Sequence, residues 1–232
     1  GTQKQQKAIL VTGASSGIGR LIAEKLAGEG HFVYAGARKP EDIKALSAIE
    51  NIEGIRLDVT KQDEIDAAVA LVRKRGKGLY GLVNNAGVGV IGPLIEIDRE
   101  DMDFQMDINV MGPYLVTRAF APLIIESKGR ISTISSISGY LTGTLYGPYS
   151  MTKFAVEAYG EALASEMKRF GVEVSIIEPG SFKSDISLAS QKRREQRGQT
   201  TEGSLYAADL EKAFSEPADR SNLGEPVAVA DA

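Results

Sequence analysis

Three polar side chains in the second half of the chain have types and spacing suited to acid–base chemistry. Tyr149 and Lys153 lie four residues apart at the predicted start of a helix, so they share one face. An ordinary phenol pKa near ~10 is too high for proton transfer at neutral pH, and a lysine ammonium one turn away lowers it by stabilising the phenolate. Ser136 follows a predicted strand, where its hydroxyl could hold a substrate carbonyl oxygen. A tyrosine and a lysine at this spacing usually mark only a surface contact. Whether this pair is catalytic therefore depends on the rest of the sequence.

A glycine-rich segment near the N-terminus supplies that context. The apolar run 8–11 predicts a buried strand and 21–26 an amphipathic helix. In the turn between them, glycines permit a tight bend, close backbone approach to a pyrophosphate and helix–sheet packing, and the free N–H groups of the helix favour an anion. We therefore predict a dinucleotide site rather than a simple turn. Its residues are Gly13, Ser15, Ser16, Gly17, Ile18 and Gly19.

The end of the second predicted strand, 32–37, indicates which dinucleotide binds. A carboxylate there would hydrogen-bond a ribose 2′-hydroxyl, whereas an arginine accommodates a 2′-phosphate. The strand is followed by Arg38 and Lys39, with no acidic residue before Glu41. The sequence thus favours NADP(H) over NAD(H), which stays possible. The alternative is a solvated arginine at the end of a strand.

Two further strand ends carry polar or small residues on the side where the crevice of such a sheet opens. Asp58 could accept a hydrogen bond from the adenine amino group, and Asn85 and Gly87 could form the wall beneath the adenosine ribose. Each also has a structural alternative, because Asx residues cap helices and glycines open turns. The full set predicted to contact the adenosine half here is Asp58, Val59, Asn85, Ala86 and Gly87.

The hydrophobic pattern predicts alternating strands and helices around these residues. Strands are expected at 8–11, 32–37, 54–59, 79–84, 129–134 and 172–177, and helices at 40–48, 62–75, 101–126 and 148–170. This order predicts an α/β fold of the Rossmann type, a doubly wound parallel sheet with strand order 3-2-1-4-5-6 and helices on both faces. Pro113 and Pro122 should kink or interrupt the helix 101–126. A seventh strand is expected beyond Ala232.

Composition excludes several classes of function. The chain has 232 residues, a length suited to one domain over 1–232, and a net charge of −4 that gives no reason to expect nucleic acid as a partner. It has no cysteine and one histidine, His31, so thiol catalysis is excluded and no metal site is expected. We see no signal peptide or membrane span and expect a cytoplasmic protein with a small-molecule substrate.

The pattern changes after the sixth predicted strand. The segment from Ser181 to Thr201 is polar and contains the basic cluster Lys192, Arg193, Arg194 and Arg197. Such clusters usually form a solvated helix face. Their position past the last strand also favours a lid over the ligand crevice, so we predict a substrate lid at about 181–216, with a helix from about 204 to 214.

Five motifs in order resemble those of the short-chain dehydrogenase/reductase family. They are Thr12-Gly13-x-x-x-Gly17-x-Gly19, Asn84-Asn85-Ala86-Gly87, Ser135-Ser136, Tyr149-x-x-x-Lys153 and Pro179-Gly180. The resemblance implies that Tyr149 is the general acid/base and that Lys153 also holds the nicotinamide ribose. It further implies that Ser136, with Ser135 and Ser138 as competitors, orients the substrate, and that Asn109 completes a proton relay.

The same resemblance extends past the sixth strand. It implies that Pro179 and Gly180, followed by Phe182, cover the nicotinamide. Ser184 stands where the family often has a threonine that touches the carboxamide.

The substrate is expected to be a hydrophobic alcohol or ketone. The predicted pocket is apolar with several phenols, although these side chains could equally belong to the core; it consists of Ser136, Ile137, Tyr140, Leu145, Tyr146 and Tyr149. The local sequences around Arg38 and Pro179 are similar to those of hydroxysteroid and retinol dehydrogenases, which implies a steroid-like or retinoid-like substrate.

Relatives commonly pair through their two long helices, so the resemblance implies a homodimer or homotetramer through 101–126 and 148–170. The outer faces of these helices are expected to carry Met102, Met106, Val110, Phe154 and Tyr159. The alternative function is a non-catalytic protein that senses NADP(H). A sugar-nucleotide epimerase is a further rival, but this chain is short for one.

Replacing Arg38 with Asp should move cofactor preference toward NAD(H), because the carboxylate repels a 2′-phosphate and accepts from a 2′-hydroxyl. We expect the ratio of NADPH to NADH affinity to fall by about tenfold or more, measured by fluorescence titration of both cofactors. Equal discrimination before and after the change would refute the assignment.

Overall fold

Six parallel strands form one sheet in the part of the chain that the structure describes. The computed structural model describes residues 6–85, 87–135, 143–178 and 183–215. The strand order is β3-β2-β1-β4-β5-β6, which confirms the predicted fold class and its reversal between β1 and β4. The strands are β1 (Ala8–Val11), β2 (Phe32–Ala37), β3 (Ile52–Arg56), β4 (Gly81–Asn84), β5 (Arg130–Ile134) and β6 (Glu173–Ile177).

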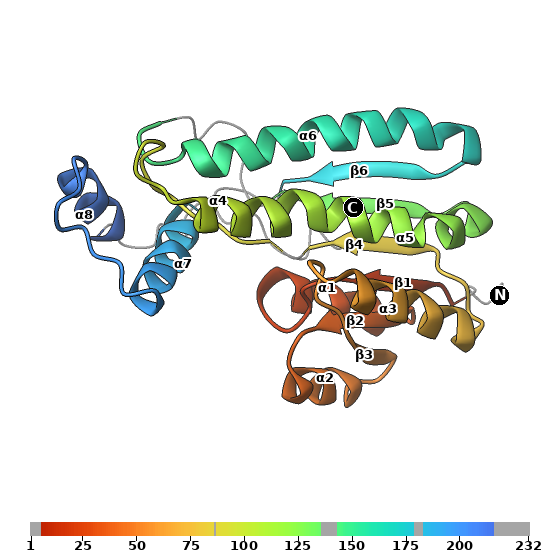
Figure 1. Ribbon diagram of the computed structural model, residues 1–232. Coiled ribbons are helices and arrows are strands. Elements are labelled where there is room, and N and C mark those ends of the chain that lie inside the picture. Colours follow the sequence, from red (N-terminus) through yellow and green to blue (C-terminus); the bar gives the residue numbers. More distant parts are fainter. Residues whose placement is uncertain (1–5, 86, 136–142, 179–182, 216–232) are drawn as a thin grey trace.

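Helices cover both faces of the sheet. They are α1 (Gly17–Gly28), α2 (Pro40–Ser47), α3 (Gln62–Arg75), α4 (Arg99–Met106), α5 (Gly112–Ser127), α6 (Gly147–Met167), α7 (Lys183–Gln196) and α8 (Ala207–Ser215), with short segments η1 (Asp107–Met111) and η2 (Lys168–Phe170). One core lies between the sheet and helices α3, α5 and α6, and a second between the sheet and α1 and α2. Figure 1 shows α7 and α8 beyond the carboxyl ends of the strands.

The third strand begins and ends earlier than the sequence pattern predicts. It runs over Ile52–Arg56 instead of 54–59, because its ladder with β2 starts at the pair Val33–Ile52. The Leu57 N–H makes the next bond to the sheet, to the Ala37 carbonyl at 2.9 Å. Asp58 then begins a turn. The early glycine at 54 weakened the strand signal without preventing pairing.

The predicted helix 101–126 is one continuous run, Arg99–Ser127, with a π-helical turn at η1 in its middle. Pro113 falls in the first turn of α5, just after this irregularity, and the Gly112 N–H bonds to the Asp107 carbonyl five residues back. The irregularity therefore precedes Pro113, and Pro122 is accommodated within α5.

By length and composition the run Arg99–Ser127 is also apolar enough to cross a membrane, a test that core helices pass too. Here its apolar face packs on the sheet. The side chains that it buries include Val116, Phe120, Leu123 and Ile124. Burial in the core accounts for part of the apolar composition of this helix.

The glycine loop after β1 is tied to the loop after β4. The Asn85 backbone N–H donates to Thr12 Oγ1 at 2.9 Å, and Asn85 Nδ2 donates to the Gly13 carbonyl at 3.2 Å. Gly19 packs so closely here that a Cβ on it would overlap both the Gly13 oxygen and Asn85 Nδ2. The two loops at the centre of the sheet therefore hold each other in place.

Two glycines of α1 form a matched test of this close approach. Gly19→Ala should cost about 1–3 kcal/mol of unfolding free energy, because the new methyl group displaces the loop. Gly28→Ala meets nothing within 4 Å and should instead be neutral or stabilising by up to about 1 kcal/mol. Thermal and urea unfolding measure both, and equal effects of the two substitutions would contradict the packing described.

Candidate active site

A cavity of about 270 Å³ lies over the carboxyl ends of β1, β2 and β3. It brings together many of the residues predicted to contact the adenosine half of a dinucleotide. Its lining includes Gly13, Ser15, Ser16, Arg38, Asp58, Val59, Asn85 and Gly87. Ala86 lies outside the described residues.

Two charged residues of this cavity differ in how they are held. Arg38 is exposed, and within the described part of the chain its guanidinium has no hydrogen bond or ion pair. Asp58 Oδ1 accepts from both the backbone N–H and the hydroxyl of Thr60, at 3.0 and 2.7 Å. Burial acts to raise the pKa of Asp58, but the Thr60 hydrogen bonds and the charges of Arg38 and Lys61 outweigh it and lower that pKa. Asp58 therefore shapes its turn while remaining charged.

The N-terminus of α1 is open to an anion. Ser16 is the N-cap residue but makes no side-chain capping bond, and no acidic residue lies in the first turn. Gly17 has φ +59° and open space where a Cβ would project. Free N–H groups, a positive dipole end and a missing side chain are what a diphosphate requires. The residues present thus fit a nicotinamide dinucleotide.

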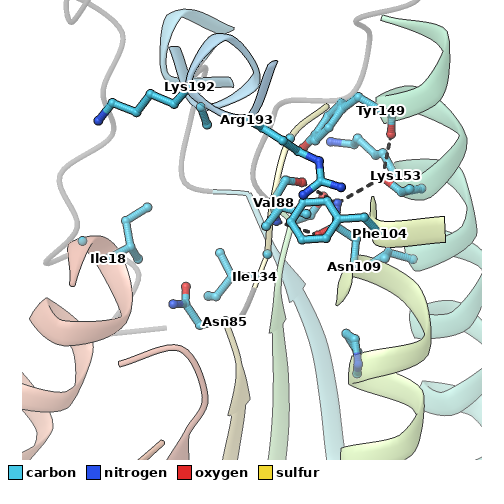
Figure 2. A pocket seen from close by; sticks show the side chains of 18 of the residues that line it. Ile18, Asn85, Val88, Phe104, Asn109, Ile134, Tyr149, Lys153, Lys192 and Arg193 are labelled. Carbon is cyan, nitrogen blue, oxygen red and sulfur yellow. Dashed lines mark hydrogen bonds between the residues drawn. The ribbon is translucent and has the colours of Figure 1, made fainter. Parts of the chain in front are cut away.

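A second cavity of about 570 Å³ continues from the first toward α6. The two cavities share Asn85, Gly87, Val88 and Phe104. The larger cavity is bordered by Ile18 from the start of α1 and by Ile134 and Ser135 at the end of β5. Its other lining residues include Asn109 of η1, Tyr149, Thr152 and Lys153 of α6, and Lys192 and Arg193 of α7. Figure 2 shows Tyr149, Lys153 and Asn109 across this cavity from Ile18.

Tyr149 and Lys153 are both nearly buried at the edge of the cavity, with 3% and 7% of their surfaces exposed. The helix α6 begins with Pro148 in its first turn, and this fixes where the pair starts. The structure therefore puts the predicted pair on one helix face that borders the cavity.

Asn109 lies in η1 and holds the loop after β4. Its Nδ2 donates to the Val88 carbonyl at 2.6 Å, and its Oδ1 accepts from the Val88 N–H at 2.8 Å. Nδ2 also reaches Thr152 Oγ1 on α6 at 3.4 Å. Asn109 thus connects the floor of the cavity to the helix that carries Tyr149 and Lys153.

Lys153 has a partner that sequence reasoning missed. Its Nζ donates to Glu178 Oε1 at 2.9 Å, just past the end of β6. Glu178 in turn is hydrogen-bonded to Glu157, one turn further along α6. The four-residue spacing of Lys153 and Glu157 predicts that they share one face of a helix, but no pattern in the sequence links Glu178 to either residue.

The basic segment after β6 forms α7, which borders the cavity and is anchored to α4. Arg193 Nε donates to Asp101 Oδ1 at 2.8 Å, and its guanidinium stacks 3.7 Å from the Phe104 ring centroid. Arg197 bonds the same buried Asp101 oxygen at 2.6 Å. Lys192 is exposed at the cavity edge. Two arginines of the basic cluster that was predicted to form a solvated helix face therefore make ion pairs with α4 instead.

Several predicted substrate residues do not line the described cavity. Leu145 and Tyr146 pack with Ile91, Tyr149 and Leu210 of α8 in a separate core cluster. Ser184 lies in α7, and its side chain is not described. Other predicted residues lie outside the described part of the chain, namely Ser136, Ile137, Tyr140, Pro179, Gly180 and Phe182.

Comparisons with known proteins agree with this geometry. A family model described as "short chain dehydrogenase" matches residues 7–195. The mitochondrial D-beta-hydroxybutyrate dehydrogenase of Bos taurus is 38% identical over 192 residues, which cover 78% of this chain and 56% of that protein. Retinol dehydrogenase 16 of Rattus norvegicus is 36% identical over 188 residues, covering 79% of this chain and 59% of that protein. The chain thus spans little more than half the length of these relatives.

One similar protein has been solved with a cofactor bound. A metagenomic short-chain oxidoreductase in complex with NADP is 35% identical, with a TM-score of 0.70, and the match covers 75% of this chain and 82% of that one.

Proposed function

Because the chain belongs to the short-chain dehydrogenase family, we propose that it is an oxidoreductase. It interconverts a secondary alcohol and a ketone, or a primary alcohol and an aldehyde, with a nicotinamide dinucleotide. The observation that carries the proposal is that Tyr149 and Lys153 border the same cavity as the uncapped, glycine-lined N-terminus of α1. One end of the cavity is suited to a diphosphate and the other to proton transfer.

The proposed mechanism assigns proton transfer to Tyr149. A bound nicotinamide supplies or accepts the hydride. The Tyr149 hydroxyl gives a proton to the substrate oxygen during reduction and takes it back during oxidation, and the Lys153 ammonium stabilises the phenolate. Asn109 holds the Val88 loop at the floor of the cavity, so the reacting groups keep a fixed geometry. Ser136 is the proposed hydroxyl that orients the substrate.

We propose NADP(H) as the preferred cofactor. Support comes from Arg38, which borders the smaller cavity and makes no hydrogen bond or ion pair in the described ranges, so its guanidinium is available to a 2′-phosphate. The 35% identical oxidoreductase was solved with NADP, so that relative binds the cofactor proposed here. NAD(H) would lack this contact.

We propose a small hydrophobic substrate, of steroid-like or retinoid-like character. Val88, Phe104 and Ile134 give the cavity apolar walls. Among the relatives, one carries the name of a retinol dehydrogenase and another that of a hydroxybutyrate dehydrogenase, which acts on a short carboxylate. A panel of ketones that includes retinoids, steroids and short oxoacids separates these two classes.

The rival function is an NADP(H)-binding protein without catalysis. Such a protein requires the glycine loop and Arg38 but has no use for a buried phenol beside an ammonium. The joint burial of Tyr149 and Lys153 at the cavity edge favours the enzyme.

We also propose that the chain forms a homodimer or homotetramer through α5 and α6. These helices and η1 expose large apolar side chains, namely Met111, Tyr114, Met151 and Phe154. Of the residues expected on this face, Tyr159 instead turns its hydroxyl to Thr117 at 2.7 Å. Phe154→Arg should therefore yield monomers in analytical ultracentrifugation, whereas Phe170→Arg, at an exposed site on η2, should leave the oligomer intact. An unchanged oligomer in Phe154→Arg would exclude this interface.

The substitution Tyr149→Phe tests the enzyme proposal. It removes only the phenolic oxygen, so kcat should fall by about 100-fold or more while the dissociation constant for NADPH changes by less than about twofold. Turnover is followed by NADPH absorbance on the ketone panel, and cofactor binding by fluorescence. Retained turnover in the variant would exclude Tyr149 as the proton donor.

A further inference from the structure

An ion pair between a buried ammonium and a partly exposed carboxylate adjoins the proposed reaction centre. The Lys153 ammonium, with 6% of its side chain exposed, donates to Glu178 Oε1 at 2.9 Å. Lys153 projects from α6 and Glu178 follows β6, so the pair joins the helix that carries Tyr149 to the sheet. A charge pair in this position acts on every group that titrates beside it.

A second carboxyl completes the cluster. Glu157 lies one turn after Lys153 on α6 and hydrogen-bonds Glu178, while its buried Oε1 has no donor among the described residues. Two ionised carboxylates accept hydrogen bonds only, so this contact requires a proton between them. Burial, followed by the hydrogen bond and charge of Glu178, raises the pKa of Glu157. Of the two carboxyl groups, Glu157 therefore holds a proton more readily than Glu178.

Glu178 is correspondingly the charged member of the pair. Burial acts to raise the pKa of Glu178, but its hydrogen bonds to Lys153 and Glu157 and the charge of Lys153 outweigh it and lower that pKa. Glu178 thus contacts both the Lys153 ammonium and the carboxyl group of Glu157.

We propose that Glu178 is a positioning residue of the reaction centre, which anchors the Lys153 ammonium and sets the electrostatic field at Tyr149. Beside Tyr149 the positive charge of Lys153 is therefore partly offset by one negative charge. This inference rests on the proposed role of Tyr149.

Other charged groups border the site but do not replace this pair. Lys192 and Arg193 line the same cavity from α7. Arg193 is paired with Asp101 at 2.8 Å. The pKa shifts of Glu157 and Glu178 arise from burial, from each other and from Lys153. The cluster is thus a local unit.

The test is a spectroscopic titration of the free protein, which needs neither cofactor nor substrate. The absorbance change of Tyr149 ionisation is obtained as the difference between each protein and its Tyr149→Phe counterpart. Removing a nearby negative charge disfavours bound protons, so Glu178→Gln should lower the midpoint of this change by about one pH unit. The alkaline limb of kcat/KM should move in the same direction in active protein.

Three further variants make the result specific. Glu178→Asp keeps the charge and should restore the wild-type midpoint. Glu157→Gln changes the carboxyl group next to Glu178 but leaves the Lys153–Glu178 pair in place, so it should lower the midpoint less than Glu178→Gln does. Glu161→Gln removes an exposed carboxylate one turn further along α6 and controls for a general change in charge.

The outcomes separate this inference from the proposed function. An unchanged midpoint in Glu178→Gln, with thermal unfolding like that of wild type, would overturn the positioning role even if the enzyme is active. A lowered midpoint supports it even if no ketone of the panel turns over. Glu178→Ala should give the same downward shift, so the test stands if the Gln variant folds poorly.

Discussion

The architecture of the site depends on the hydrogen bonds that tie the loop after β1 to the loop after β4. These strands are neighbours in the sheet although two strands and three helices separate them in sequence. The crossovers diverge here, so the two loops leave a crevice that must be kept open and aligned. Asn85, bonded to Thr12 and Gly13, does this with short polar contacts. The absence of a Cβ at Gly19 lets the backbone come close enough to make them.

From this tie the two ends of the site extend in opposite directions along the sheet. Toward β2 and β3 lie Arg38 and the turn shaped by Asp58. Toward β5 and β6 lie Tyr149 and Lys153, whose helix is linked through Asn109 to the same β4 loop. Asn85 and Asn109 thus have comparable structural roles on the two sides of β4. Each fixes a loop that no regular hydrogen-bond ladder could hold.

Much of this was predictable from sequence because the signals are local. Strand order followed from the alternation of elements, and the Tyr149–Lys153 face followed from helical spacing. Contacts between residues distant in sequence were not predictable. The Lys153–Glu178 pair, the anchoring of α7 through Asp101 and the packing of Leu145 against α8 arise only when the elements are assembled. The boundary of β3 was misjudged for the same reason, since pairing with β2 overrode the weak signal around Gly54.

The π-helical turn at Asp107–Met111 has a geometric consequence for the whole run from Arg99 to Ser127. One additional residue in a turn shifts the phase of a helix by about 100°. The part before it directs Asp101 and Gln105 toward α7 and the β4 loop, while the part after it directs Val116 and Phe120 into the core. Loss of a single residue there would restore a regular helix and turn one of these two faces away from its partner. A one-residue insertion thus lets one helix serve both the cavity and the core.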